Sequence, residues 1–88
     1  MANTLPDKVL SPAAYQSAYT LTGITVGQPL VIQNKSSSYV TIQIQSAQPA
    51  SSSVDGMVLP PLEQTVITGT ISNVWLLGNG PVSIMQNN

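Results

Sequence analysis

Residues 72–86 read SNVWLLGNGPVSIMQ, and this stretch decides the fold class that the sequence predicts. An apolar run at residues 74–77 precedes the turn residues Gly78-Asn79-Gly80-Pro81. Gly and Asn tolerate positive φ angles and Pro fixes φ, so this cluster marks a tight turn. An alternating strand at residues 82–86 follows it. The pattern predicts a β-hairpin that closes the domain and carries Trp75, the single tryptophan of the chain.

Short strands separated by turn signals are expected along the rest of the chain. The clearest lies at residues 39–45, where Val40, Ile42 and Ile44 alternate with uncharged polar residues that we interpret as a solvated face. No connection is long and helical enough for parallel βαβ units. The further strands are expected at residues 14–22, 30–33, 56–59, 62–68, 74–77 and 82–86. The sequence therefore predicts an all-β protein, a small mainly antiparallel β-sandwich or barrel of about six to seven short strands.

The first 14 residues show no steady hydrophobic period, and Pro6 and Pro12 interrupt any helix. We predict an extended N-terminal arm over residues 1–14 and a sandwich domain over residues 15–88. The arm either docks on a neighbouring protein or is a poorly ordered terminus. Its candidate attachment residues are Leu5, Val9 and Leu10.

The composition is unusual in its small number of charged residues. They make up 6% of the 88 residues, against about 25% in typical soluble domains. The five charged residues are Asp7, Lys8, Lys35, Asp55 and Glu63. Two lysines without arginine cannot follow a phosphate backbone, so nucleic-acid binding is not expected. A nearly uncharged surface does not repel copies of itself and favours dense packing among identical neighbours.

The residue types that catalysis needs are scarce. The chain has no His and no Cys, so neither a disulfide nor the common soft metal ligands are available. Serine hydrolysis needs a base, and the two lysines lie in the predicted arm and in a turn. Outside the arm the only acids are Asp55 and Glu63, separated by a Pro-Pro segment that does not suggest a carboxylate pair. We therefore expect a non-enzymatic protein without a cofactor or metal.

No targeting or membrane segment is expected. Residues 1–8 lack the continuous apolar region of a signal peptide. No apolar run approaches the roughly 20 residues that span a bilayer. These observations favour synthesis in a cytoplasm without membrane insertion.

Aromatic and apolar residues near the predicted strands are candidates for the core or a subunit interface: Trp75, Leu77, Tyr19 and Tyr39. The alternative is a sugar-stacking surface. Residues 74–77 are apolar on both faces of their strand. In a small domain such a strand is either internal or covered by another chain, which supports a homo-oligomer.

Residues 59–84, from LPPLE to NVWLLGNGPVSI, resemble small accessory virion proteins of tailed bacteriophages, which include capsid decoration (cement) and short head-fibre proteins. The segment QPLVIQN at residues 28–34 is similar in style, and the resemblance covers roughly residues 20–86. It implies a β-sandwich, often trimeric, that binds in many copies to the major capsid protein or another virion protein. The expected function is a virion structural protein, most simply a decoration protein made in the bacterial host cytoplasm. The alternative is a carbohydrate- or receptor-binding module on a tail or fibre.

Overall fold

A computed structural model describes residues 7–53, 55–68 and 72–86 of the chain. These residues form eight strands and one short helix. In chain order the elements are β1 (Lys8–Leu10), β2 (Gln16–Ser17), α1 (Ala18–Thr22), β3 (Leu30–Asn34), β4 (Val40–Ile44), β5 (Met57–Leu59), β6 (Gln64–Ile67), β7 (Val74–Leu77) and β8 (Gly80–Gln86).

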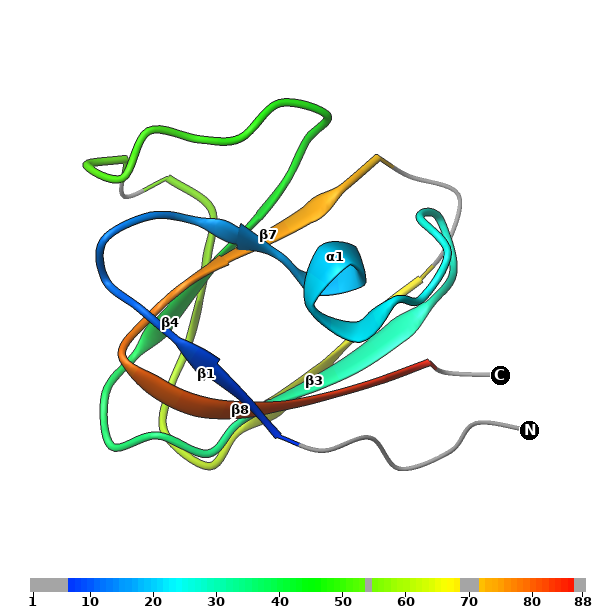
Figure 1. Cartoon of the computed structure of the whole chain (residues 1–88). Helices are drawn as coiled ribbons and strands as arrows, with labels where there is room; N and C mark the ends of the chain where they lie inside the picture. Colours follow the sequence, from blue (N-terminus) through cyan, green and yellow to red (C-terminus); the bar gives the residue numbers. More distant parts are fainter. Residues whose placement is uncertain (1–6, 54, 69–71, 87–88) are drawn as a thin grey trace.

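The strands form two four-stranded sheets that pack face to face (Figure 1). Sheet A has the order β1-β8-β3-β6, and sheet B has the order β2-β7-β4-β5. Every pair of neighbouring strands is antiparallel. The predicted small all-β antiparallel sandwich is confirmed, with eight strands in the described residues instead of six to seven.

Consecutive strands alternate between the two sheets, with one exception. Only β4 and β5 follow each other along the described chain and also pair within one sheet. Eight strands arranged in this order form a jelly roll, a sandwich built from two interlocked Greek keys. A jelly roll joins its sheets by connections that pass over the sandwich edges. The conformation of these loops therefore determines the topology as much as the strand pattern does.

The predicted hairpin at residues 72–86 is wrong, although both of its strands exist. Strand β7 pairs with β2 and β4 in sheet B, whereas β8 pairs with β1 and β3 in sheet A. The turn cluster therefore carries the chain from one sheet to the other. Gly80 has a φ of +131°, and a Cβ there would lie 2.7 Å from the Cβ of Ser36. A short Gly-rich turn fits a hairpin or a crossover equally well, and only the packing of the two sheets determines which of the two forms.

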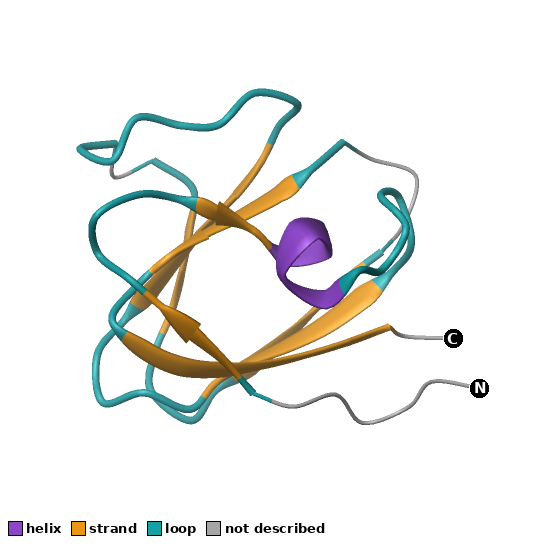
Figure 2. Ribbon diagram, viewed as in Figure 1, coloured by secondary structure: helices purple, strands orange, loops and turns teal. Residues whose placement is uncertain are grey.

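The strand expected at residues 14–22 is also wrong over most of its length. Strand β2 is two residues long, and α1 begins directly after it (Figure 2). The Ser17 hydroxyl accepts a hydrogen bond from the Thr20 N–H, and Gly23 ends the helix at a φ of +80°. An N-cap serine and a glycine in the left-handed region are the ordinary boundaries of a helix. Here the two capping residues favour a helix more strongly than the alternating Tyr and Thr pattern favours a strand.

Part of the predicted arm is a strand of the sandwich, β1. Residues Lys8, Val9 and Leu10 pair with β8, and Leu10 is buried in the core. Leu10 is therefore a core residue and not a free attachment point, while Val9 is 71% exposed. Leu5 lies outside the described residues.

The core lies between the two sheets and beside α1. Figure 1 shows the helix between β7 of one sheet and β3 of the other. The buried apolar cluster consists of Leu10, Ala18, Tyr19, Leu30, Ile32, Val40, Ile42, Leu59, Ile67, Val74, Leu76, Val82 and Ile84. These residues come from both sheets and from the helix, as expected for a single sandwich core.

Candidate functional site

Two of the four residues predicted for the core or a subunit interface lie on the outer face of sheet B. Val74 and Leu76 of β7 point into the core, so the alternate residues Trp75 and Leu77 face outward and are half-buried. The Trp75 indole N–H donates to the backbone oxygen of Gln45 at 2.9 Å. The polar atom of Trp75 is thus used within the domain, and its ring offers apolar contact area to a partner.

The other two predicted residues have opposite environments. Tyr19 is part of the core at 2% exposure, and its hydroxyl donates to the backbone oxygen of Gln28 at 2.7 Å. Tyr39 directly precedes β4 and is 64% exposed. The structure therefore does not gather the four residues into one site. Tyr19 stabilises the fold, while Tyr39 is available to a partner.

Gln43 is the main polar residue that sequence reasoning placed wrongly. It belongs to the row predicted to be solvated, yet it is only 7% exposed. Its side-chain amide donates to the Tyr15 hydroxyl at 3.0 Å and to the Ser53 hydroxyl at 2.9 Å. The Tyr15 hydroxyl in turn donates to the backbone oxygen of Ser53 at 2.8 Å. This group of side chains holds the loop after β4 over the outer face of sheet B.

The loop after β4 carries no sequence signal for this role. Its small polar residues indicate an exposed connection, and most of them are exposed. Pro49, however, is buried, and the Gln48 amide donates to the backbone oxygen of Tyr15 at 2.6 Å. Gln48 and Tyr15 are 33 positions apart in the chain, so no local pattern could reveal the contact.

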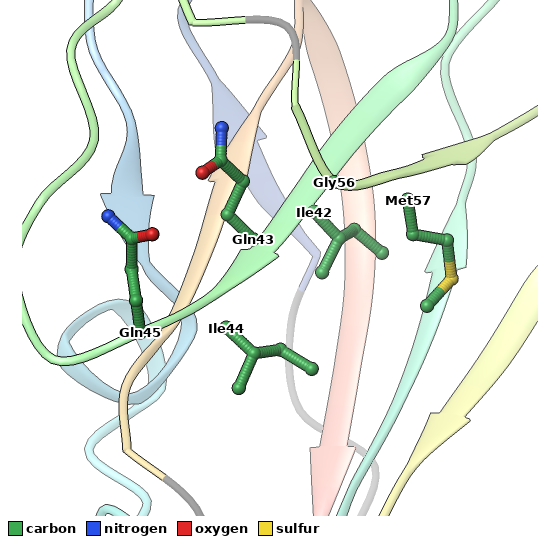
Figure 3. Close-up of a pocket in the computed structure, with 6 residues that line it drawn as sticks. All are labelled: Ile42, Gln43, Ile44, Gln45, Gly56 and Met57. Atoms are coloured by element: carbon green, nitrogen blue, oxygen red, sulfur yellow. The ribbon is translucent and has the colours of Figure 1, made fainter.

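A shallow hollow of about 300 Å³ opens where β4 extends beyond the first residue of β5 (Figure 3). The last residue of β4 that pairs with β5 is Ile42, which lies opposite Met57. Figure 3 shows the side chains of Ile42, Ile44 and Met57 on one side of β4, with Gln43 and Gln45 pointing the other way. The lining consists of Ile42, Gln43, Ile44, Gln45, Gly56 and Met57. Such a lining offers mainly apolar contacts to another chain, because the amide groups of Gln43 and Gln45 already donate hydrogen bonds within the domain.

Exposed apolar residues are concentrated near β5 and β6. Eight large hydrophobic residues are exposed in the described part of the chain, and six of them lie on or beside β4, β5 and β6. We call these six residues the apolar side: Tyr39, Ile44, Met57, Val58, Leu62 and Val66. The six do not share one face, because Val58 points outward from sheet B and Val66 points outward from sheet A. Single exposed hydrophobic residues are ordinary, but several on two edge strands of a small domain suit a partner that covers both edges.

Leu62 is the most unusual member of the apolar side. It has a φ of +66°, the left-handed region that bulky residues rarely adopt, and its side chain is 70% exposed. Its N–H donates to the backbone oxygen of Asn34 at 2.6 Å. Its own backbone oxygen accepts from the Gln33 amide at 3.3 Å. The turn thus holds a leucine side chain outward at the cost of backbone strain.

Two of the five charged residues, Asp55 and Glu63, lie beside this surface. One ion pair occurs in the described residues, between Lys35 and Asp7 at 2.8 Å. Asp55 precedes β5 and Glu63 precedes β6, and both are exposed. Groups of His, Cys, Asp or Glu that could hold a metal do not occur among the residues that the structure describes. The described part of the chain also contains no helix with the length and hydropathy to cross a bilayer.

Comparison with known proteins gives no relative: no family model, no curated protein and no solved structure matches the chain. The site is therefore defined by its own geometry, which offers mainly apolar groups for contact with another macromolecule.

Proposed function

We propose that the chain is a non-enzymatic structural protein of a tailed-phage virion, most simply a capsid decoration protein that binds and stabilises the shell. The observation that carries this proposal is the apolar side, six exposed apolar residues that lie on or beside β4, β5 and β6. A domain that remains bound to neighbouring proteins tolerates such a surface, whereas a freely diffusing one risks aggregation.

Two further features are compatible with this role. Jelly rolls are common in viral capsid proteins, an argument by analogy because the same fold also serves lectins and cupins. The five charged residues lie in connections or, for Lys8, at the start of an edge strand. Contacts with a shell would then rest on buried apolar area and strand pairing and would respond little to salt.

In this proposal the chain is made in the host cytoplasm and joins the virion, where it contacts the major capsid protein or another virion protein. It also associates with copies of itself, most simply as a trimer. The half-buried outward residues Trp75 and Leu77 and the exposed Tyr39 supply contact area on sheet B. The exposed Val9 supplies contact area at an edge of sheet A.

Binding to shells tests the proposal directly. Purified chain is mixed with heads of the phage that carries its gene, unbound chain is removed by sedimentation, and bound copies are counted by quantitative mass spectrometry. We expect saturable binding at a fixed ratio to the shell subunits and a higher temperature of shell rupture. A double variant, Val58→Ser with Val66→Ser, should bind more weakly, while Val26→Ser in a distant loop serves as the control. Absence of saturable binding to any virion component would refute the proposal.

Carbohydrate or receptor binding is the second candidate, favoured by one observation. Tyr39 is 64% exposed and directly precedes β4 of sheet B. Exposed aromatic rings stack on sugars. A glycan array compared between the wild type and Tyr39→Ala separates this function from shell binding, because a glycan-binding protein would lose its array signal with this substitution and a decoration protein would give none.

A further inference from the structure

Both sheets end in strands that have an unpaired edge in the described part of the chain. The edges of sheet A are β1 and β6, and the edges of sheet B are β2 and β5. The outer backbone groups of an edge strand can pair with a strand of another molecule unless charge, proline or a covering segment blocks them. Strands β1 and β6 lie on opposite edges of the same sheet, so a contact between them in two molecules would continue sheet A from one to the next.

The two edges carry opposite charge. Lys8 begins β1 and is half-buried, without an ion pair among the described residues. The other lysine, Lys35, is already paired with Asp7. At the opposite edge Glu63 precedes β6 and Asp55 precedes β5, and both are exposed without a cationic partner in the described residues. The positive charge at one edge is therefore complementary to the negative charges at the other.

The apolar residues of the two edges are also complementary. Val9 of β1 is 71% exposed, directly after Lys8. Val66 of β6 is 52% exposed, and Leu62 is held outward at 70% exposure before the same strand. Each edge thus offers an exposed aliphatic residue within a few positions of its charge.

We propose that a second copy of this chain docks head to tail, with β1 of one copy against the turn that leads into β6 of the next, so that Lys8 faces Glu63 and Val9 faces Leu62. The inference rests on the self-association included in the proposed function and names its contact. The two surfaces differ, so the contact is heterologous: it forms a ring if the rotation closes and a filament if it does not.

Charge reversal tests this contact. Lys8→Glu places like charges at the contact between identical copies, and so does Glu63→Lys. Each variant alone should associate about tenfold more weakly at low salt than the wild type, as measured by analytical ultracentrifugation. An equimolar mixture of the two should recover association, because the introduced glutamate of one variant then meets the introduced lysine of the other. Val26→Glu and Val26→Lys place a charge on an exposed loop outside the contact and should have no effect.

Disulfide trapping provides a second readout if a charge variant folds poorly. The chain has no cysteine, so a mixture of Val9→Cys and Leu62→Cys chains can be oxidised without background. Each variant chain carries a single cysteine, so any disulfide joins two molecules. We expect a covalent dimer of the two variants, and none when Val9→Cys is mixed with Val26→Cys.

The outcomes separate this contact from the wider proposal. If neither charge reversal weakens association, or if the mixture of the two variants does not restore association, the head-to-tail contact is wrong while self-association still holds. A wild-type chain that stays monomeric at all concentrations would overturn both. Neither result affects the shell-binding measurement, which tests the structural role separately.

Discussion

The side-chain amide of Asn34 donates a hydrogen bond to the backbone oxygen of Leu59 at 2.9 Å and so joins the end of β3 in sheet A to the end of β5 in sheet B. The same amide donates to the Ser38 oxygen at 2.7 Å. Its oxygen accepts from the N–H and hydroxyl groups of Ser36 at 2.9 Å and 2.6 Å. Asn34 is completely buried, so one side chain satisfies several groups that water cannot reach.

Asn34→Ala should therefore be among the most damaging single substitutions. It leaves buried carbonyl and N–H groups without partners, and each such group costs about 1–3 kcal/mol. We expect the free energy of unfolding to fall by about 2–4 kcal/mol in urea titrations. Asn79→Ala, at an exposed turn position, is the matched control and should change it by less than about 0.5 kcal/mol. Equal effects of the two substitutions would contradict the linking role of Asn34.

Leu62→Asn should raise stability, in contrast to most substitutions. Leu62 has a φ of +66°, where Asn is tolerated better than a bulky residue. Because its side chain is 70% exposed, little core packing is lost. We expect a gain of about 0.5–1 kcal/mol in the free energy of unfolding of the monomer. The exposed Val26, which has a negative φ, should give no gain as Val26→Asn. A loss of stability in Leu62→Asn would show that the leucine packs more than its exposure indicates.

Two glycines allow backbone strain to be separated from steric conflict. Gly23 has a φ of +80°, and a methyl group added there would meet no atom within 4 Å, so Gly23→Ala should cost about 1 kcal/mol from the backbone alone. Gly80 has a φ of +131°, and its Cβ would lie 2.7 Å from the Cβ of Ser36. Gly80→Ala should therefore lower the melting temperature clearly more than Gly23→Ala in paired thermal unfolding measurements. Similar decreases in melting temperature for the two variants would mean that the turn at Gly80 adjusts easily to the added methyl group.

Tyr19 should make stability depend on alkaline pH. Burial raises the pKa of its hydroxyl above the usual value of 10.0, and a backbone hydrogen bond at Gly27 acts in the opposite direction. The folded state therefore favours the protonated form. The stabilisation is complete below the unfolded pKa of about 10 and is lost as the pH rises through the higher folded pKa. Urea unfolding measured between about pH 9 and pH 12 should show this loss.

Tyr19→Phe is the control for this pH dependence. It removes the hydrogen bond to the Gln28 oxygen and should cost about 1 kcal/mol at neutral pH. It should also flatten the alkaline decline relative to the wild type. A Tyr19→Phe variant with the same decline as the wild type would assign the alkaline sensitivity to other groups.

The strands are largely predictable from the sequence, but their partners are not. Alternation at Val40 and Ile42 identifies β4, and the run around Leu76 identifies β7, because side-chain direction follows local geometry. Pairing depends on contacts between distant segments. The turn at Gly80 has a length and composition that suit a hairpin, yet it connects two sheets. Only the packing of both sheets against one core selects the crossover.

The candidate site is also only partly predictable from the sequence, because it too depends on contacts between segments far apart in the chain. The sequence indicates Tyr39 as a residue of the core or of an interface and Val9 as a residue of an attachment arm, and both side chains are exposed. The polar row around Gln43 predicts a solvated side chain, but a loop that contains Ser53, ten residues away, covers it. Ser17 and Gly23 do carry a local signal for a helix, since they are a good N-cap and a good C-cap.

The position of β8 has a consequence for synthesis. It is the last strand of the described residues, yet it lies inside sheet A between β1 and β3. A nascent chain that has not reached β8 leaves β1 without its partner and the sheet split in two. Folds dominated by such distant pairings form slowly. Sheet A is therefore complete only once residues 80–86 have left the ribosome.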